Sequence, residues 1–397
     1  RRILYAYQRN TNSHSRYQTM ISPEQFVESL RQHNIRFFAG VPDSLLKNLC
    51  AYLSARLPEK EHIIAANEGG AIGMSIGYHL ATGNIGCVYM QNSGEGNIIN
   101  PLLSLADEKI YDIPMLLIIG WRGEPGIKDE PQHITQGALT LPLLDTMGVP
   151  YAVLDDNWEQ QLATALSYIH EHNGRYALII RKNTFDQPNI PTTCSQQQLP
   201  LSREEAIETI VSHTTAKDKI VATTGMISRE LFEYRERQQM GHAADFLTVG
   251  GMGHANQIAL TIALQCPHHR VWCLDGDGAV LMHMGGMAII ANSDATNFIH
   301  IVLNNGAHDS VGGQPTVGLS IDIPKIASAM GYKHAYNAKD KSELVDILNN
   351  IHQLTGPILI NVMVRKGNRS DLGRPTTTPI QNKQAFMAQI NRIEDEA

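Results

Sequence analysis

Short apolar runs alternate with longer stretches of helical composition along most of the chain. In the first half these runs lie at residues 37–39, 63–66, 87–90, 115–119, 152–154 and 178–180. The second half repeats the rhythm with runs at 220–222, 271–274, 298–303 and 358–364. Apolar strands separated by helices are typical of a parallel sheet that helices cover on both faces. The pattern therefore predicts an α/β protein.

Helix-start signals and a proline-rich gap divide this pattern into two parts. A serine followed three residues later by glutamine or glutamate predicts a capped helix start at Ser22 and at Ser202. Residues 186–201 lie between the two parts and contain three prolines and a run of three glutamines, which indicates a linker. The predicted organisation is a leader at 1–19, a first domain at 20–185, the linker, a second domain at 202–379 and a C-terminal helix at 380–397.

The two predicted domains align with each other at a constant offset of 184 positions. This offset places Ser44 on Ser228, Glu68 on Met252, the turn at 92–94 on that at 276–278, and the strand at 116–119 on that at 300–303. A repeat of this length predicts two homologous doubly wound parallel-sheet domains of one topology. No third domain is expected between them.

The first nineteen residues differ from the rest in charge. They hold four arginines and no acidic residue. Such leaders can be organelle-targeting presequences. Because organised sequence begins abruptly at Ser22, we expect residues 1–19 to be a disordered leader ahead of Met20.

Composition narrows the class of protein. The chain has 397 residues, 32 of them Lys or Arg and 39 Asp or Glu, which gives a net charge of −7. This balance argues against nucleic acid or an anionic membrane as the main partner and favours an enzyme acting on a small molecule. The five cysteines are scattered, without the spacing of a zinc or redox motif. We therefore expect these cysteines to be small residues of the hydrophobic core, in a protein of the reducing cytoplasm.

Two polar motifs follow apolar runs in the second half. Gly276-Asp277-Gly278 follows one run, and Asn304-Asn305 ends another run 25 residues later. If both runs are parallel strands, their carboxyl ends bring a carboxylate and an amide oxygen together, and this set suits Mg²⁺. The glycines allow backbone N–H groups to approach an anion. Because Asp277 would repel a diphosphate unless a metal lay between them, the motifs predict a bound Mg²⁺–diphosphate.

This spacing resembles the cofactor motif of the thiamine-diphosphate enzymes. The resemblance implies that Asp277, Asn305 and the backbone carbonyl of Ala307 hold Mg²⁺. It also implies a glutamate after a strand of the other domain, and Glu68 occupies that place. A desolvated Glu68 would share a proton with the aminopyrimidine ring, which activates the exocyclic amine to remove the thiazolium C2 proton. From its position alone, Glu68 could equally be an acid favoured by a helix dipole.

The same resemblance extends to other cofactor contacts. Met252 would be the bulky residue that wedges the cofactor into its bent form, although an ordinary core methionine is as common. Further cofactor contacts are expected at Asn92, Gly225, Gly276 and Gly278. In this family the two domain types of different subunits face each other, which implies a homodimer or larger homo-oligomer with active sites between subunits.

Several loops indicate which family of thiamine-diphosphate enzymes the sequence resembles. Residues 40–44, 120–125, 129–133, 305–314 and 371–375 together resemble the phosphonopyruvate decarboxylase family, and the match spans residues 20–379. It implies decarboxylation of 3-phosphonopyruvate to phosphonoacetaldehyde and CO₂ in phosphonate biosynthesis. A substrate with carboxylate and phosphonate charges needs cationic or N–H donors outside the metal site.

Candidate residues for the substrate fall into two groups. Those at predicted strand ends, which could position the substrate or supply the final proton, are Asp43, Ser44, His308 and Asp309. Those that could bind its charged groups are Arg122, Lys128, His133, Ser310, Arg369 and Arg374. Taken singly, each of the second group is also compatible with a solvated surface position.

Alternatives remain within and outside this family. A sulfopyruvate decarboxylase or a carboligase of the acetolactate-synthase type would share the cofactor and differ in substrate. A regulatory binding protein on the same fold would lack the glutamate, whereas Glu68 is present. An unrelated Mg²⁺-nucleotide protein is disfavoured because the chain has no G-x-x-x-x-G-K-[ST] loop.

Overall fold

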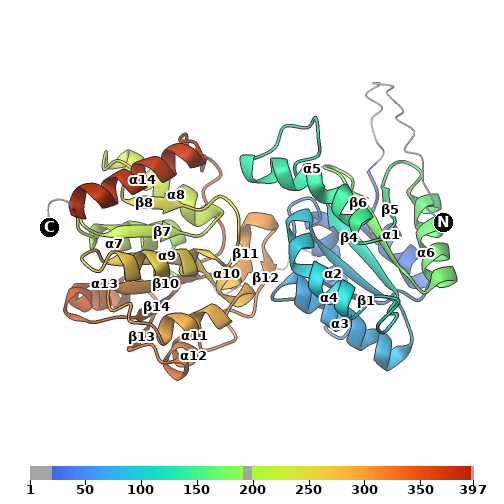
Figure 1. The fold of residues 1–397 in the computed structure, drawn as a ribbon, viewed down its shortest axis with the longest axis horizontal. Coiled ribbons are helices and arrows are strands. Elements are labelled where there is room, and N and C mark those ends of the chain that lie inside the picture. The colour runs from blue at the N-terminus through green and yellow to red at the C-terminus, as the bar shows by residue number, and fades with distance from the viewer. Residues whose placement is uncertain (1–19, 191–198, 395–397) are drawn as a thin grey trace.

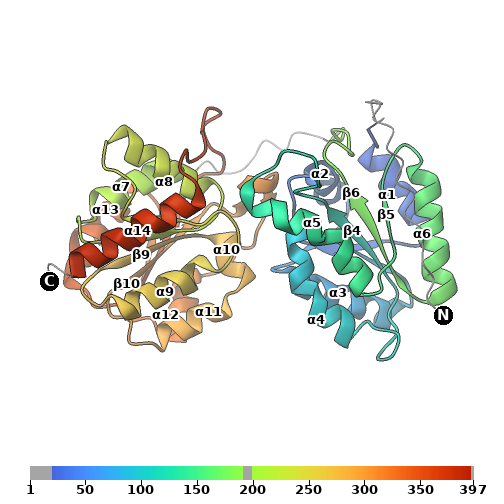
Figure 2. The ribbon, with the colours of Figure 1, turned by 45° about the horizontal axis from the view of Figure 1, so that its top comes forward.

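The structure is a computed structural model and describes residues 20–190 and 199–394. The expected leader at 1–19 and the central part of the expected linker lie outside the described residues. Figure 1 and Figure 2 show two α/β domains beside each other, each built around one sheet with helices on both faces. This arrangement confirms the predicted fold class.

The N-terminal domain contains a six-stranded parallel sheet in the order β2-β1-β3-β4-β6-β5. Its strands are β1 (Phe37–Gly40), β2 (His62–Ile64), β3 (Gly86–Gln91), β4 (Met115–Gly120), β5 (Tyr151–Val153) and β6 (Arg175–Ile180). Its helices are α1 (Pro23–Gln32), α2 (Lys47–Arg56), α3 (Glu68–Thr82), α4 (Glu95–Ser104), α5 (Pro131–Thr146) and α6 (Trp158–His172), with a short 3₁₀ turn, η1 (Asn92–Gly94), before α4.

The C-terminal domain contains a second six-stranded parallel sheet, in the order β13-β14-β10-β9-β7-β8. Its strands are β7 (Lys219–Ala222), β8 (Asp245–Leu247), β9 (Val271–Gly276), β10 (Phe298–Asn304), β13 (His334–Ala338) and β14 (Ile358–Met363). Its helices are α7 (Arg203–Ser212), α8 (Met226–Arg237), α9 (Ala255–Gln265), α10 (Asp277–Met282), α11 (Gly285–Ala291), α12 (Ile323–Met330), α13 (Lys341–Asn350) and α14 (Pro379–Glu394). A small hairpin, β11 (Ala307–His308) and β12 (Gln314–Pro315), follows β10.

The two sheets have the same topology. In chain order, the strands of each sheet are arranged 2-1-3-4-6-5 across it. Three matching strand pairs, β1 with β7, β3 with β9 and β4 with β10, start 182 to 185 positions apart, close to the expected 184. At β3 and β9 the offset is 185, so Asp277 corresponds to Asn92 rather than to Ser93.

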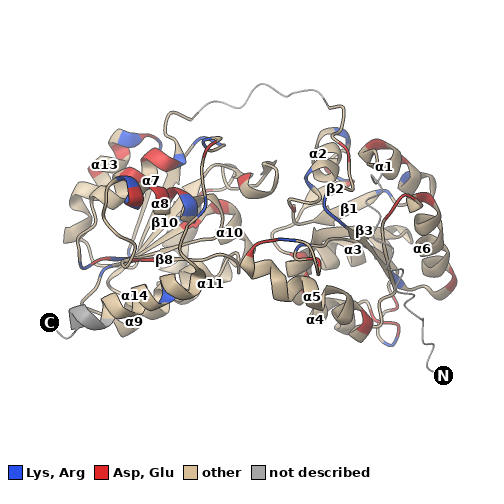
Figure 3. Ribbon diagram, turned by 90° about the horizontal axis from the view of Figure 1, so that it is seen from above, with Lys and Arg blue, Asp and Glu red and all other residues tan. Residues whose placement is uncertain are grey.

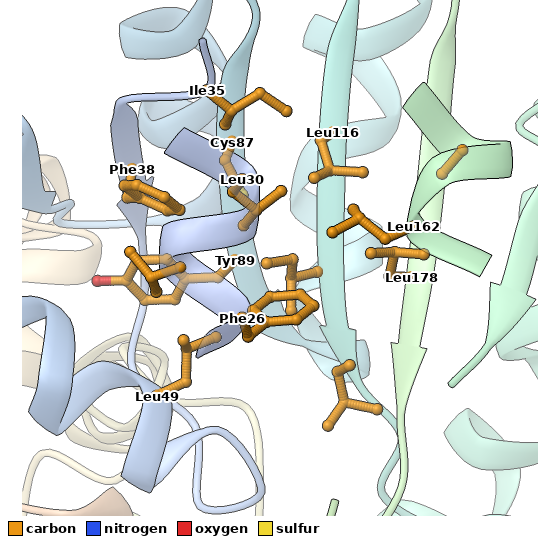
Figure 4. Close-up of a cluster of buried hydrophobic side chains, with 14 of the residues drawn as sticks. Phe26, Leu30, Ile35, Phe38, Leu49, Cys87, Tyr89, Leu116, Leu162 and Leu178 are labelled. Atoms are coloured by element: carbon orange, nitrogen blue, oxygen red, sulfur yellow. The ribbon is translucent and has the colours of Figure 1, made fainter. Parts of the chain in front are cut away.

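Both faces of each sheet are buried, which explains the continuous apolar runs. Alternate strand residues Phe38, Cys87, Leu116 and Leu178 pack under α1, α2 and α6 (Figure 4). The residues between them pack on the opposite face under α3, α4 and α5. In the C-terminal domain, α7, α8 and α13 cover one face, and α9 to α12 cover the other. The four described cysteines are buried, as expected of core residues.

The predicted helix caps form. The Ser22 side chain accepts a hydrogen bond from the backbone of Gln25. Ser202 and Glu205 form a reciprocal capping box. The C-terminal helix α14 packs on strand β8 through Phe386, which contacts Phe246. Within the described ranges, every helix falls short of the length and apolar character needed to span a membrane.

Two edge strands were missed by the sequence pattern. Strand β8 contains Asp245, which is fully buried and forms a two-bond ion pair with Arg235 at 2.8 Å. Strand β13 has a mostly half-buried, mixed polar sequence. Because edge strands bury less apolar surface than central ones, these two lack the apolar run that marks the others.

Candidate functional site

Asp277 lies at the carboxyl end of β9, as the first residue of α10, and is 2% exposed. One carboxylate oxygen accepts a hydrogen bond from the backbone N–H of Asn305 at 3.4 Å, and the other accepts from the Thr316 hydroxyl. Burial raises the pKa of Asp277 to about 6, although these hydrogen bonds oppose the shift. No cation of the described residues pairs with this buried carboxylate, which suits a bound metal ion.

The two asparagines at the end of β10 have different partners. The Asn304 amide donates to the Gly318 carbonyl at 2.7 Å and to Asn361, so it fixes the loop after β12. The Asn305 side-chain oxygen accepts from the Ala307 N–H at 3.0 Å, and its amide donates to Asp309 at 2.7 Å. Asp277, Asn305 and Ala307 therefore lie together, with carboxylate, amide and carbonyl oxygens of the kind that Mg²⁺ prefers.

Glycine backbone lines the space beside Asp277. A Cβ on Gly278 would lie 2.9 Å from His308 Cε1 and 3.3 Å from Met252 Cε. Gly225 has φ of 99°, and a Cβ on it would lie 3.5 Å from the Ser310 Cβ. The structure thus gathers five of the sequence candidates around one glycine-lined cradle. Such a cradle fits an anion held by backbone N–H groups, which is what a diphosphate needs.

Glu68 lies at the corresponding edge of the N-terminal sheet, where it is the first residue of α3 and 5% exposed. Asn67 caps this helix by accepting from the Gly70 N–H at 2.8 Å. One Glu68 oxygen accepts from the Asn97 amide at 2.7 Å. A Cβ on Gly94 would lie 2.6 Å from the other oxygen. The carboxylate is therefore fixed against the turn that follows β3.

The two edges face each other. The Asn67 amide donates to the Met282 carbonyl at the end of α10, at 3.3 Å. Glu130 and Arg374 form an ion pair between the domains. In Figure 1 and Figure 2, α10 and the β11–β12 hairpin of the C-terminal domain lie next to the N-terminal domain. Glu68 and Asp277 of one chain thus belong to one region between its two domains, whereas the family resemblance implied that domains of different subunits face each other.

Asp43 and Ser44 lie after β1 at the same edge. Asp43 is buried, and burial raises its pKa to about 6. One of its oxygens accepts from the Leu45 N–H at 3.0 Å. The Ser44 hydroxyl accepts from Arg122, which follows β4, at 2.9 Å. Arg122 also forms two hydrogen bonds with Asp129, at 2.8 and 2.5 Å.

Asn92 supports this arrangement. Its amide donates to the Arg122 carbonyl at 2.8 Å and to the Thr140 hydroxyl at 2.9 Å, and its oxygen accepts from the Arg122 N–H. All of these contacts lie within the N-terminal domain. The structure therefore places Asn92, expected as a cofactor contact, as a brace for the Arg122 backbone.

Three histidine and lysine candidates differ in environment. His308 is largely buried beside Gly278, and burial lowers its pKa to about 4. His133 is buried with no partner for Nδ1 among the described residues, and burial followed by the Arg122 charge lowers its pKa. Lys128 is exposed in the loop before α5.

Asp309, Arg369 and Arg374 are already engaged by other residues. The Asp309 carboxylate accepts from Arg203, Asn305 and the Gly367 N–H at 2.7 to 2.9 Å. Arg369 pairs with Glu204, Glu233 and Asp371. Figure 3 shows acidic and basic positions gathered around α7 and α8. Asp309 therefore supports the Asn305 loop, and Arg369 stabilises the C-terminal domain surface.

Some residues that shape the site were not singled out from the sequence. They are Asn97 beside Glu68, Thr316 beside Asp277, and the buried Arg203–Glu230 ion pair behind Asp309. Asn97 carries a signal that could have been used, because it closely follows the apolar run at 87–90 and so belongs to the same sheet edge. Thr316, Arg203 and Glu230 have no such signal.

Comparisons with known proteins agree with this geometry. The family profile "Thiamine pyrophosphate enzyme, N-terminal TPP binding domain" matches residues 22–145, and the corresponding C-terminal domain profile matches residues 223–362. Thiamine pyrophosphate is another name for thiamine diphosphate. No profile match falls between the two, consistent with the expected absence of a middle domain.

Relatives that match over most of this chain indicate a more specific family. A phosphonopyruvate decarboxylase of Streptomyces viridochromogenes is 33% identical and covers 93% of this chain and 95% of that protein. One of Streptomyces hygroscopicus is 32% identical and covers 92% and 93%. A sulfopyruvate decarboxylase of Methanosarcina acetivorans is 26% identical and covers 88% and 93%. With its two thiamine-diphosphate-binding domains, the chain belongs to the phosphonopyruvate decarboxylase family of thiamine-diphosphate-dependent carboxy-lyases.

Proposed function

We propose that this enzyme decarboxylates 3-phosphonopyruvate to phosphonoacetaldehyde and CO₂, with Mg²⁺ and thiamine diphosphate. One observation carries the proposal: Glu68 and Asp277 lie at the carboxyl edges of two sheets that have the same topology, and these edges face each other. The Asn67–Met282 hydrogen bond joins the two edges. The choice of substrate is supported by the two relatives of that activity that are 32–33% identical over more than nine-tenths of the chain.

The C-terminal domain would hold the cofactor's charged end. Asp277, Asn305 and the Ala307 carbonyl would bind Mg²⁺, and the backbone around Gly278 would leave room for the diphosphate. When bound, thiamine diphosphate supplies a carbon nucleophile and an electron sink for decarboxylation. Met252 and His308 line the same cradle and would shape it.

The N-terminal domain would supply the proton chemistry. The Asn97 hydrogen bond holds one Glu68 oxygen, and the other oxygen lies against Gly94. Such a fixed, buried carboxyl group can hold a proton on one oxygen and pass it to a ring nitrogen without reorganising. Asp43 and Ser44 lie at the same edge and would face the substrate's reacting end.

Assembly into a homodimer or larger homo-oligomer is part of the proposal. Gly73, Gly77 and Leu80 lie on one side of α3, since they are four and three residues apart. A Cβ on either glycine would meet nothing within 4 Å, and Leu80 is 73% exposed. This open face would allow a helix of a second copy to approach closely. Light scattering after gel filtration would measure the molecular mass of the protein in solution. A monomeric mass would contradict the proposed assembly.

Sulfopyruvate is the second candidate substrate. It is favoured by the sulfopyruvate decarboxylase that is 26% identical over 88% of this chain. Both acids carry a tetrahedral oxyanion group beside a 2-oxo acid, so the same site would accept either. Their charges differ, because a phosphonate loses a second proton near neutral pH and a sulfonate carries one negative charge.

An aldehyde-coupled assay separates the candidates. Phosphonopyruvate, sulfopyruvate and pyruvate would each be supplied with and without thiamine diphosphate and Mg²⁺. We expect a higher kcat/KM for phosphonopyruvate than for the other two acids, and no turnover without the cofactors. Preference for sulfopyruvate would keep the cofactor assignment and overturn the substrate. We further propose a cytoplasmic role in phosphonate biosynthesis, and a preference for phosphonopyruvate would support the biosynthetic part of this proposal.

A further inference from the structure

A cavity of about 280 Å³ lies over the carboxyl edge of the N-terminal sheet. It is lined by residues from the segments that follow β1, β4 and β6. Its size is near the lower end of the range for small-molecule pockets. It adjoins the Asp43–Ser44 segment, because Ser44 belongs to its wall. The cavity is therefore placed to take part of a small substrate rather than a large ligand.

The lining is rich in positive charge. Four cations contribute to it: Lys47, Arg122, Lys128 and Lys182. The two acidic groups in the lining are both paired with arginines, Asp129 with Arg122 at 2.5 Å and Glu124 with Arg181 at 2.8 Å. None of the three lysines forms an ion pair with a carboxylate of the described residues. In a chain of net charge −7, three unpaired lysines around one cavity favour an anionic ligand.

The cavity wall combines these cations with fixed apolar groups. Trp121 and Phe185 are largely buried, and the Trp121 indole donates to the Gly137 carbonyl at 2.8 Å. Arg122 is held in place by Asp129 and directs one nitrogen to Ser44. Apolar walls exclude water and strengthen charge interactions inside a cavity. An anion would thus meet one oriented donor, Arg122, beside buried apolar groups, together with three solvent-exposed lysines.

The C-terminal domain meets the cavity from the other side. The Gln314 amide donates to the Lys47 carbonyl at 3.4 Å, and a Cβ on Gly312 would lie 3.0 Å from the Lys47 Cβ. Both residues belong to the segment that follows Asn305 and Ala307. Figure 3 shows the charged segment that leads into α5 on the side of its domain facing the C-terminal domain. The cavity therefore adjoins the region that holds Glu68 and Asp277.

We propose that this cavity is the subsite for the phosphonate group of the substrate, with Lys47 and Lys182 as its main cationic ligands and Arg122 as an oriented donor. The inference rests on the proposed function. Three lysines without acidic partners favour a dianionic phosphonate over a monoanionic sulfonate, because each additional negative charge gains attraction from all of them. The subsite thus accounts for specificity through charge rather than through shape.

The test uses Lys47→Gln and Lys182→Gln in the full-length holoenzyme, with Lys60→Gln as the matched control. Lys60 is exposed in the same domain and lies outside the cavity lining. Steady-state kinetics would be measured with phosphonopyruvate, sulfopyruvate and pyruvate. We expect each cavity variant to raise KM for phosphonopyruvate at least tenfold with kcat changed less than threefold, since the phosphonate group keeps its charge and bonds through the reaction and its contacts therefore contribute uniform binding. Pyruvate kcat/KM should change less than twofold.

A second measurement does not depend on turnover. Binding of methylphosphonate, which has the anionic group without the 2-oxo acid, would be followed by isothermal titration calorimetry. We expect wild type to bind it, the cavity variants to bind at least tenfold more weakly, and Lys182→Arg to restore binding because it keeps the charge. Wild-type binding should tighten as pH rises and the probe becomes a dianion.

The outcomes separate the two proposals. Unchanged phosphonopyruvate KM and methylphosphonate binding in both variants would overturn the subsite while leaving the proposed function intact. A parallel loss of pyruvate activity would also overturn it, because the lysines would then support the fold or the chemistry in general. If wild type does not decarboxylate phosphonopyruvate but binds methylphosphonate through these lysines, the proposed function fails and the anion site stands.

Discussion

The side-chain amide of Asn67 donates a hydrogen bond across the domain boundary to the main-chain oxygen of Met282, at 3.3 Å. Asn67 caps the helix that begins with Glu68, and Met282 ends the helix that begins with Asp277. A single contact therefore joins the helix bearing the proposed proton-transfer group to the helix bearing the proposed metal ligand. Any movement between the domains would separate these two functions.

Replacing Glu68 with glutamine should separate cofactor binding from catalysis. Glu68→Gln keeps the shape of the side chain and removes the ionisable proton, so thiamine diphosphate and Mg²⁺ should still bind, whereas kcat should fall by about 100-fold to 10,000-fold. Cofactor binding is measured by calorimetry and turnover by the aldehyde assay. Glu59→Gln is the control, because Glu59 is exposed in the same domain. Near-normal turnover in Glu68→Gln would contradict the assigned role.

Removing the Asp277 carboxylate should abolish metal-dependent cofactor binding. In Asp277→Ala, we expect calorimetry to detect no binding of thiamine diphosphate in the presence of Mg²⁺, since the ion would lose its only carboxylate among the proposed ligands. Asp294→Ala, at an exposed position of the same domain, should bind as wild type does. Chelation of Mg²⁺ from wild type should reproduce the loss. Tight binding by Asp277→Ala would place the metal elsewhere.

Asp43 should impose a pH dependence on turnover. Burial raises its pKa to about 6, so it is protonated below that pH and ionised above it. If Asp43 donates the final proton, kcat should be highest below pH 6 and fall about tenfold per pH unit above it. Asp43→Asn should lower kcat and remove this slope. A slope that persists in the variant would assign the proton to another group.

Glu95 should make the fold less stable as pH rises. It is buried, one of its oxygens has no hydrogen-bond partner among the residues that the structure describes, and burial raises its pKa to about 8 from 4.5. Between these values the unfolded chain is ionised while the folded group stays protonated, so stability falls from pH 4.5 to 8 and is constant beyond. The loss at pH 7 is on the order of 3 kcal/mol. Glu95→Gln should remove it.

Urea denaturation at pH 5 and pH 8 checks this expectation. The urea midpoint of wild type should fall between the two pH values by more than that of Glu95→Gln. Glu108→Gln, at an exposed position, should follow wild type. Equal changes in all three proteins would mean that Glu95 does not control the pH dependence.

The central strands and the metal motif could be predicted because both depend on local order in the chain. Strands such as β4 and β10 are buried on both faces and therefore appear as unbroken apolar runs. Asp277 and Asn305 follow such strands, and the carboxyl edge of a parallel sheet brings them together. The fold class and the cofactor cradle could thus be predicted from the apolar runs and from the residues that directly follow them in the chain.

Other features of the site depend on contacts between residues that lie far apart in the sequence. The sequence alone does not show that Arg369 is surrounded by Glu204 and Glu233, because these residues are more than 130 positions away. Asp309 is likewise engaged by Arg203, 106 positions earlier. The cationic cavity joins residues from three loops. Of its lining, Ser44, Arg122 and Lys128 were singled out from the sequence as substrate candidates, whereas Lys47 and Lys182 were not. Such pairings are decided by tertiary packing.

The helix α14 covers the free edge of β8, the outermost strand of its sheet. Strand β8 has a neighbour on one side only, and its free side presents the Leu247 N–H and the Asp245 carbonyl. The Asn382 side chain accepts from the first at 3.0 Å and donates to the second at 2.8 Å. Asn382 thus imitates the backbone of one residue in an adjoining strand. The edge is closed against strand addition, so this end of the molecule resists the edge-to-edge aggregation that exposed strands invite.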